Sequence, residues 1–224
     1  MTRSSTSRIA GAAFLVYIAA GLTSLALSSQ ATGGARGVAD KLAGVAAHPA
    51  HVGVIVLLGF VQAFSALTLG VTLWAITRDE DRDIAMFGMV CRVAEGVIAG
   101  LSVAVMPALL SLATASGPDA DPAATRVLAK YLLRPDVGVP ATFFAAGSTA
   151  FCVLLLRGRI VPRPLAWLGV AASALLVVLL PLEMAGWLTG SVLMLMWLPM
   201  LVFELWVAVW FLVKGAAVAS SPGA

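Results

Sequence analysis

The sequence alternates between long apolar segments and short polar connections. Six apolar segments are predicted to be transmembrane helices, at about residues 9–27, 51–76, 84–114, 136–156, 165–188 and 192–213. A helix needs roughly 20 apolar residues to cross the hydrocarbon core of a bilayer, and these segments are close to or above that length. The Gly- and Ala-rich stretch at about residues 30–50 predicts a loop between the first two spans. The pattern therefore predicts an all-α integral membrane protein, a bundle of about six transmembrane helices.

The connection at residues 116–135 has the signals of a short amphipathic surface helix. Asp121 is a favourable N-cap, and Pro122 suits the first helical position. Basic residues recur every four positions, at Arg126, Lys130 and Arg134. Apolar residues lie mostly on the opposite side, so we expect this helix at the membrane surface. Its basic face either contacts lipid phosphate or is simply solvated.

The composition favours a single membrane domain over residues 1–224. The chain is 61% hydrophobic and only 11% charged, whereas a soluble domain is typically about 25% charged. The net charge of +3 is spread over short connections. We therefore expect membrane lipid as a partner and no nucleic acid.

The distribution of basic residues predicts how the chain is oriented in the membrane. Six spans place both termini on one side, and that side carries Arg3, Arg8, Arg78, Arg82, Arg157, Arg159, Arg163 and Lys214. The other side carries Arg36, Lys41, Arg126, Lys130 and Arg134. Because basic residues concentrate on the cytoplasmic side, we expect both termini in the cytoplasm.

The third segment carries two charged residues well inside an apolar run. Arg92 lies about 12 Å and Glu95 about 16 Å from its start, at about 1.5 Å per residue. An ionised side chain at such a depth costs at least about 2.5–3.5 kcal/mol. Their spacing of three places both on one helix face, so we expect that face to point inward and to find polar partners. The segment has about 31 residues, so it must also tilt, bend at Pro107 or protrude.

Two further carboxyl groups lie within predicted spans. Glu204 is near the middle of the last span, and Glu183 is nearer the end of the fifth. One arginine cannot neutralise three carboxylates, so either a glutamate is protonated or another cation or a substrate completes the set. Such a cluster is either a polar network that fixes helix register or a functional site. We interpret Glu95, Glu183 and Glu204 as candidate catalytic residues, supported by Arg92.

Tryptophan is the second candidate feature. Trp187 lies near the end of the fifth span, a position typical of the aromatic belt at a membrane interface. Trp197 and Trp206 lie deeper in the sixth span. For any single tryptophan, bulk that faces lipid is the favoured interpretation. Alternatively, an aromatic face beside a protonated carboxyl can stabilise a substrate cation, which makes all three candidate substrate-binding residues.

Other motifs carry little chemistry. Gly96 and Gly100 have the spacing that allows close contact between membrane helices. His48 and His51 lie three apart, without a third metal ligand nearby in sequence. Neither a phosphate-binding glycine loop nor a catalytic triad is recognisable. We therefore expect neither a metal nor a cofactor, and hydrophobic substrates are favoured over charged ones.

Several short motifs resemble a known family. They are Arg8-Ile9-Ala10-Gly11, Cys91-Arg92-Val93, Val161-Pro162-Arg163, Glu204-Leu205-Trp206 and Trp210-Phe211-Leu212-Val213-Lys214-Gly215. The chain is similar to a bacterial family of small integral membrane proteins catalogued as a domain of unknown function. The resemblance implies a six-helix bundle in the bacterial inner membrane and no particular activity. A second, weaker likeness, which rests on Glu95, Glu183, Glu204 and the tryptophans, is to the small membrane-bound terpene cyclases of meroterpenoid pathways.

Three functions fit these features. The leading hypothesis is a membrane-embedded enzyme that cyclises a hydrophobic, isoprenoid-type substrate by acid-initiated carbocation chemistry. The second is a proton-coupled carrier of a lipophilic compound, with the same glutamates as a proton relay. The third is a non-catalytic membrane partner protein in which the charges only fix packing.

Overall fold

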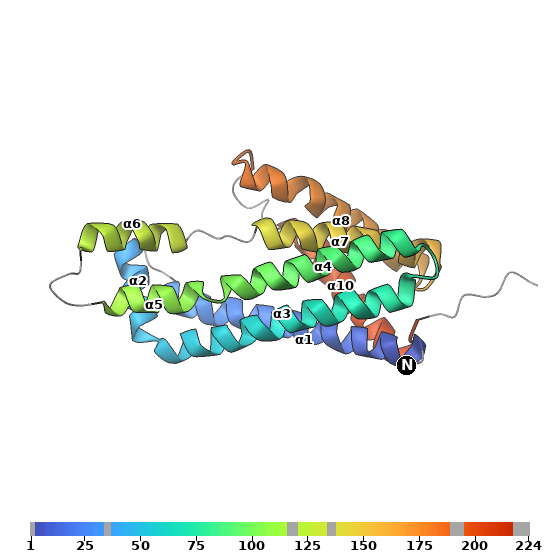
Figure 1. The fold of residues 1–224 in the computed structure, drawn as a ribbon, viewed down its shortest axis with the longest axis horizontal. Coiled ribbons are helices and arrows are strands. Elements are labelled where there is room, and N and C mark those ends of the chain that lie inside the picture. The colour runs from blue at the N-terminus through green and yellow to red at the C-terminus, as the bar shows by residue number, and fades with distance from the viewer. Residues whose placement is uncertain (1–2, 34–36, 116–120, 134–137, 189–194, 217–224) are drawn as a thin grey trace, which may run out of the picture.

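The computed structural model of the 224-residue chain describes residues 3–33, 37–115, 121–133, 138–188 and 195–216. Regular structure in these residues is entirely helical. Six helices form the main bundle: α1 (Arg3–Thr32), α3 (Pro49–Thr77), α4 (Arg82–Ser102), α7 (Gly138–Arg157), α8 (Arg163–Met184) and α10 (Leu198–Val213). They run roughly along the long axis of the molecule (Figure 1). The prediction of an all-α membrane bundle is therefore confirmed.

The six helices form a closed ring of neighbours. Each of α1, α3, α4, α7, α8 and α10 packs against the next in that order, and α10 packs back against α1. The first and last helices of the described chain are thus adjacent. This arrangement leaves an interior that side chains from most of the helices can reach.

Five helical segments in the described residues are long and apolar enough to cross a membrane: Arg3–Thr32, Pro49–Thr77, Arg82–Thr114, Gly138–Arg157 and Arg163–Met184. Each corresponds to one of the first five expected spans. The sixth expected span corresponds to α10, which is apolar but has only 16 residues. Residues 192–194 of that expected span lie outside the described residues.

The long third segment is broken rather than continuous. Helix α4 ends at Ser102, and α5 (Val105–Thr114) begins three residues later. Pro107 has no N–H, and its ring would clash with the carbonyl of Val103 in an unbroken helix. Accordingly, the amides of Val103 and Ala104 bond three residues back, to Gly100 and Leu101. Pro107, which was expected to bend the segment, thus lies about one turn after the break between α4 and α5.

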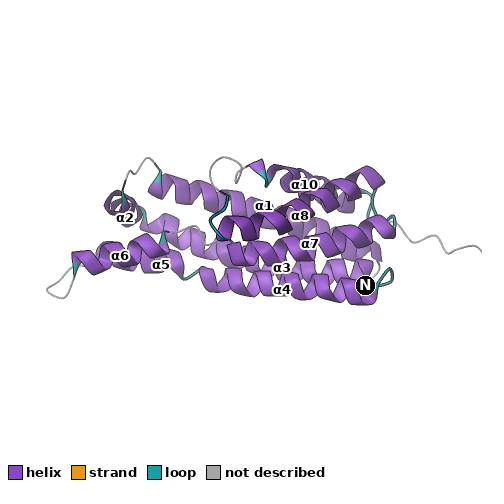
Figure 2. Cartoon of the chain, turned by 90° about the horizontal axis from the view of Figure 1, so that it is seen from above, coloured by secondary structure: helices purple, strands orange, loops and turns teal. Residues whose placement is uncertain are grey.

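A smaller group of helices lies at one end of the bundle (Figures 1 and 2). It consists of α2 (Val38–Ala47), α5 and α6 (Pro122–Leu132), packed around Val45, Val52, Leu109 and Ala129. We call this group the end cap. The amphipathic helix was expected, and the Asp121 carboxylate indeed caps α6 by accepting a hydrogen bond from the amide of Ala123. The expectation of a loop over residues 30–50 was wrong, because packing against α5 and α6 stabilises α2 there.

The opposite end carries the N-terminus, the α3–α4 turn, the α7–α8 turn and the end of α10 (Figure 1). The Arg3 guanidinium donates a hydrogen bond of 2.8 Å to the carbonyl of Ile76, which satisfies a free acceptor at the end of α3. Arg157 lies 3.6 Å from the Asp81 carboxylate. Both ends of the described chain therefore lie at this charged end, as an even number of crossings requires.

Glycines allow the helices around Arg92 to approach closely. A methyl group at Gly70 of α3 would lie 3.1 Å from Cβ of Arg92, and one at Gly147 of α7 would lie 3.4 Å from its Cγ. Gly96 similarly brings α4 against the Ala63 carbonyl of α3, where a Cβ would lie 3.0 Å from the oxygen. Small residues thus enclose the arginine stem from two sides.

Candidate functional site

A buried cluster of three polar side chains joins α1 to α4. The guanidinium of Arg92 lies 2.8 Å from Oε2 of Glu95, and the Tyr17 hydroxyl donates a 2.8 Å hydrogen bond to Oε1. Arg92 is 1% exposed and Glu95 is 3% exposed. The prediction that this pair faces the interior and contacts another polar group is confirmed. The carboxylate is therefore held between a cation and a hydroxyl.

The Arg92 guanidinium also lies over two aromatic rings. Its central carbon lies 5.5 Å from the ring centroid of Tyr17 and 4.9 Å from that of Phe144. Its Nε and Nη2 atoms are buried without a hydrogen-bond partner among the described residues. Cation–π attraction of this kind partly replaces lost hydration. Arg92 is thus fixed by Glu95 on one side and by two rings on the others.

Glu204, on α10, has a different environment. It is 5% exposed, and its Oε1 atom has no hydrogen-bond partner among the described residues. The described residues also place no cation within ion-pair distance of it. No described side chain therefore neutralises or hydrogen-bonds the Glu204 carboxyl. An unpaired carboxylate is very costly in apolar surroundings.

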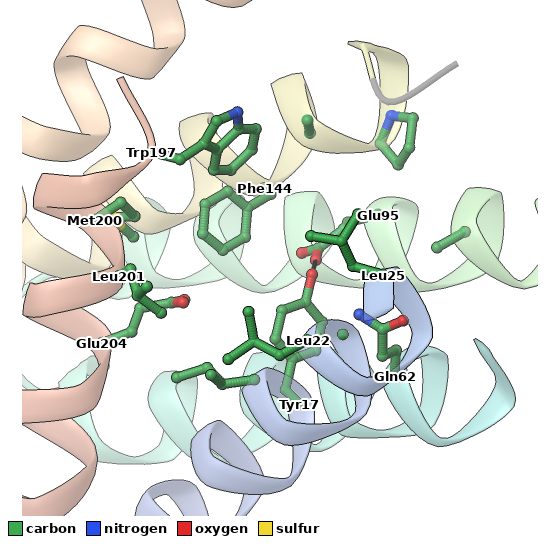
Figure 3. Close-up of a pocket in the computed structure, with 15 residues that line it drawn as sticks. Tyr17, Leu22, Leu25, Gln62, Glu95, Phe144, Trp197, Met200, Leu201 and Glu204 are labelled. Atoms are coloured by element: carbon green, nitrogen blue, oxygen red, sulfur yellow. Dashed lines mark hydrogen bonds between the residues drawn. The ribbon is translucent and has the colours of Figure 1, made fainter. Parts of the chain in front are cut away.

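A cavity of about 460 Å³ brings these groups together. Its lining residues come from α1, α3, α4, α7 and the α10 region: Tyr17, Ile18, Gly21, Leu22, Leu25, Gln62, Glu95, Ala99, Pro140, Ala141, Phe144, Trp197, Met200, Leu201 and Glu204. Figure 3 shows the Tyr17–Glu95 pair and Glu204 reaching toward the cavity from different helices. Most of the lining is apolar, and a few polar groups converge on it. That combination is typical of a small-molecule site.

The structure brings together only some of the residues expected from the sequence. Glu95, Glu204 and Trp197 line the cavity, and Arg92 lies behind it. Glu183, on α8, is half-buried and not part of the lining. Trp187 and Trp206 are 79% and 58% exposed and also lie outside it. Since α8 contributes no lining residue, the candidate site consists of two carboxyl groups rather than three.

A family comparison covers almost the whole chain. The family described as "Domain of unknown function (DUF4386)" matches residues 9–215. The chain belongs to the DUF4386 family. The motifs at both ends of the sequence had indicated such a family, and its description assigns no activity. No curated protein and no solved structure matches the chain.

Two polar residues that line the cavity of this DUF4386 protein were not identified as site residues from the sequence. Tyr17 lies in the middle of α1, and Gln62 lies in the middle of α3. Both carry a hydrogen-bonding group within an otherwise apolar span, where such groups need partners. That signal was present but was outweighed by the charged residues.

The described part of this DUF4386 chain holds no group of three side chains suited to a metal. His48 and His51 stack with ring centroids 4.9 Å apart, and His48 bonds the carbonyl of Gly44. Cys91 and Cys152 are free and buried. The groups that line the cavity itself are carboxyl, hydroxyl, amide, thioether, aromatic and aliphatic side chains.

Proposed function

We propose that this protein is a membrane-embedded enzyme that cyclises a hydrophobic, isoprenoid-type substrate by acid-initiated carbocation chemistry. One observation carries the proposal: a paired and an unpaired carboxyl group face the same apolar cavity. Acid–base catalysis requires two such groups in different protonation states. The different partners of the two glutamates support such a difference.

Glu204 is the proposed acid. A neutral carboxyl carries the proton that an alkene or an epoxide needs to form a cation. In the first step the Glu204 O–H bond breaks. On an alkene the proton forms a C–H bond as the double bond is lost, and on an epoxide it forms an O–H bond as a ring C–O bond breaks. The cation is left on the substrate and the negative charge on Glu204, and a second double bond then attacks the cation to close a ring.

Glu95 is the proposed base. Its carboxylate, held by Arg92 and Tyr17, accepts the proton that the cyclic cation loses when its final double bond forms. For an alkene substrate the reaction is an isomerisation, since one proton enters and one leaves. Transfer of that proton from Glu95 to Glu204 restores the starting state.

Aromatic faces are available for the cationic intermediate. Phe144 and Trp197 both line the cavity, with ring centroids 6.1 Å apart. Attraction between a cation and such rings is worth about 0.5–2 kcal/mol each. In the proposed reaction the two rings stabilise the developing charge between acid and base.

The cavity is also suited to a substrate that arrives from the bilayer. Leu22 and Leu25 line it and are 54% and 65% exposed, so it reaches the surface along α1. Its volume of about 460 Å³ falls within the range of roughly 300–1,000 Å³ common for small-molecule sites. An apolar substrate would therefore enter without crossing water.

Conversion of a panel of prenylated aromatic compounds tests the proposal. We expect the purified protein in lipid nanodiscs to produce cyclic isomers, which have the mass of the substrate and are therefore separated by chromatography before mass spectrometry. Glu204→Gln should lower conversion by about 10²–10⁴-fold, the usual worth of a general acid. Glu183→Gln, a matched change outside the cavity, should retain conversion. Equal conversion by the Glu204 variant and wild type would refute the assigned acid.

The two alternatives predict different results. A proton-coupled carrier would convert nothing but would move protons across a vesicle membrane when a lipophilic compound is added. A non-catalytic partner protein would do neither. Loss of structure in the Glu204 variant would also favour a packing role over catalysis.

We further propose that the protein lies in the bacterial inner membrane with both termini in the cytoplasm. The excess of basic residues at the charged end supports this orientation. A cysteine introduced at Lys130 of α6 should react with an impermeant thiol reagent in intact cells. Because Cys91 and Cys152 are buried, their background should be low. Labelling only after permeabilisation would reverse the orientation.

A further inference from the structure

Gln62 is a polar side chain placed deep within a membrane helix. It is the fourteenth residue of the 29-residue α3, so it lies about 20 Å from either end of that helix. Such a position is inside the hydrocarbon layer, whose thickness is about 30 Å. The side chain is half-buried and lines the cavity beside the exposed residues of α1.

The Gln62 amide has no hydrogen-bond partner among the described residues. Other polar groups in the same helix bond locally, as the Thr68 and Thr72 hydroxyls do with carbonyls of α3. An amide has two donor hydrogens and an accepting oxygen, and water is scarce at this depth. A cavity ligand with a polar group would supply the partner that the protein does not.

Helix α1 leaves room for the amide. A methyl group at Gly21 would lie 2.8 Å from Nε2 of Gln62, closer than contact allows. The absence of a side chain at Gly21 therefore allows the amide to lie against α1 at the edge of the cavity. In Figure 3, Gln62 and Glu204 lie on opposite sides of the Tyr17–Glu95 pair.

We infer that Gln62 forms a head-group subsite for a hydroxyl or carbonyl oxygen of the cavity ligand. The ligand is then an oxygenated isoprenoid, with its polar end at Gln62 and its hydrocarbon extending past Phe144 toward Glu204. This inference rests on the proposed function for the isoprenoid class of ligand, but not for catalysis. It deepens that proposal by fixing which end of the molecule meets the acid.

Competition binding in nanodiscs tests the subsite. Bound tritiated farnesol is displaced by unlabelled farnesol or by farnesene, a similar hydrocarbon without the hydroxyl. We expect wild type to bind the alcohol about tenfold more tightly than the hydrocarbon, the worth of one hydrogen bond. Gln62→Leu, which has similar volume, should lose this preference while hydrocarbon affinity is retained. Gln30→Leu, on the exposed end of α1, is the matched control.

Gly21→Ala provides a second variant, because its methyl group should displace the amide and lower alcohol affinity without removing it. An unchanged alcohol preference in Gln62→Leu would overturn the subsite, and so would failure of wild type to bind either compound. If binding depends on Gln62 but the prenylated aromatic panel is not converted, the subsite is supported and the enzyme is refuted. If Gln62→Leu binds the alcohol and converts the panel as wild type does, the subsite is refuted and the enzyme is supported.

Discussion

Glu95 and Glu204 line one cavity, yet their walls are built differently. On the side of α4, Glu95 is held by the Arg92 guanidinium and by the Tyr17 hydroxyl of α1, each at 2.8 Å, and rings from α1 and α7 cover the arginine. The α10 wall leaves the Glu204 carboxyl without a described partner. Burial alone therefore does not define a functional carboxyl. The first side pairs a buried carboxylate with a buried arginine, and the second leaves a buried carboxyl without a described counter-charge.

Removing the Glu95 carboxylate should give the largest effect on stability. Glu95→Leu leaves the Arg92 charge buried and unpaired, which typically costs about 3–5 kcal/mol. Unfolding in mixed detergent, followed by circular dichroism, should show this loss. Glu183→Leu, on the outer helix α8, should stay within about 1 kcal/mol of wild type.

A double substitution tests whether the unpaired Arg92 charge is the cause of the expected loss of stability. Arg92→Met combined with Glu95→Leu removes both charges, and replacement of a whole buried pair is often close to neutral. We therefore expect the double variant to recover most of the stability that Glu95→Leu loses. A double variant as unstable as the single one would show that the pair is not the reason for the loss.

Tyr17→Phe should have an intermediate effect. It deletes the hydroxyl that donates to Glu95 but keeps the ring beside Arg92. A hydrogen bond to a charged group contributes about 1.5–3 kcal/mol, so unfolding should shift by that amount. Tyr131→Phe on α6, where the ring is exposed, serves as the control. Equal changes in unfolding free energy for the two tyrosine variants would show that the Tyr17 hydroxyl does not stabilise Glu95.

Tryptophan substitutions should separate the cavity from the lipid-facing surface. Trp197→Leu removes one ring from the cavity, and the loss of about 0.5–2 kcal/mol of cation stabilisation should lower conversion about 2- to 30-fold. Trp206→Leu, on the exposed face of α10, should leave conversion unchanged. Mass-spectrometric product yields from matched amounts of protein provide the measurement. A larger loss from Trp206 would contradict the assigned role of Trp197.

Glu204→Leu should have the smallest effect on stability. No described ion pair is lost, and an unpartnered polar group leaves an apolar environment. We expect the unfolding transition to stay within about 1 kcal/mol of wild type or to rise. A loss as large as that of Glu95→Leu would mean that Glu204 has a structural partner, and the contrast between the walls would disappear.

Most of the fold was predictable because spans are long and their apolar content is high. The five longest helical segments correspond to expected spans, and Pro107 marked the weak point of the third. Helix α2 was missed although Val38, Leu42 and Val45 recur at helical spacing, because ten residues are too few for a span and its stability depends on contacts with α1, α5 and α6. Local pattern predicts spans well and short packed helices poorly.

The site was only partly predictable, for a related reason. Helices such as α8 and α10 are apolar on all sides, so the sequence does not show which face points inward. Glu183, Trp187 and Trp206 were therefore grouped with Glu204 from depth alone, and the structure separates them. Arg92 and Glu95 were easier, since a buried charge permits only an inward orientation. Tyr17 and Gln62 gave a weaker form of the same signal, because an uncharged polar group in a span constrains its orientation less than a charge does.

The adjacency of α1 and α10 has a consequence for how the protein is made. Chains are synthesised from the N-terminus, and early elements pack before late ones are available. The Tyr17–Glu95–Arg92 cluster uses only α1 and α4, so its charges can be matched while the nascent chain is still being inserted. Glu204 arrives on α10, the last helix in the described chain. The cavity thus gains its unpaired carboxyl only when the ring closes, so a chain truncated before α10 would hold the charge pair without the proposed acid.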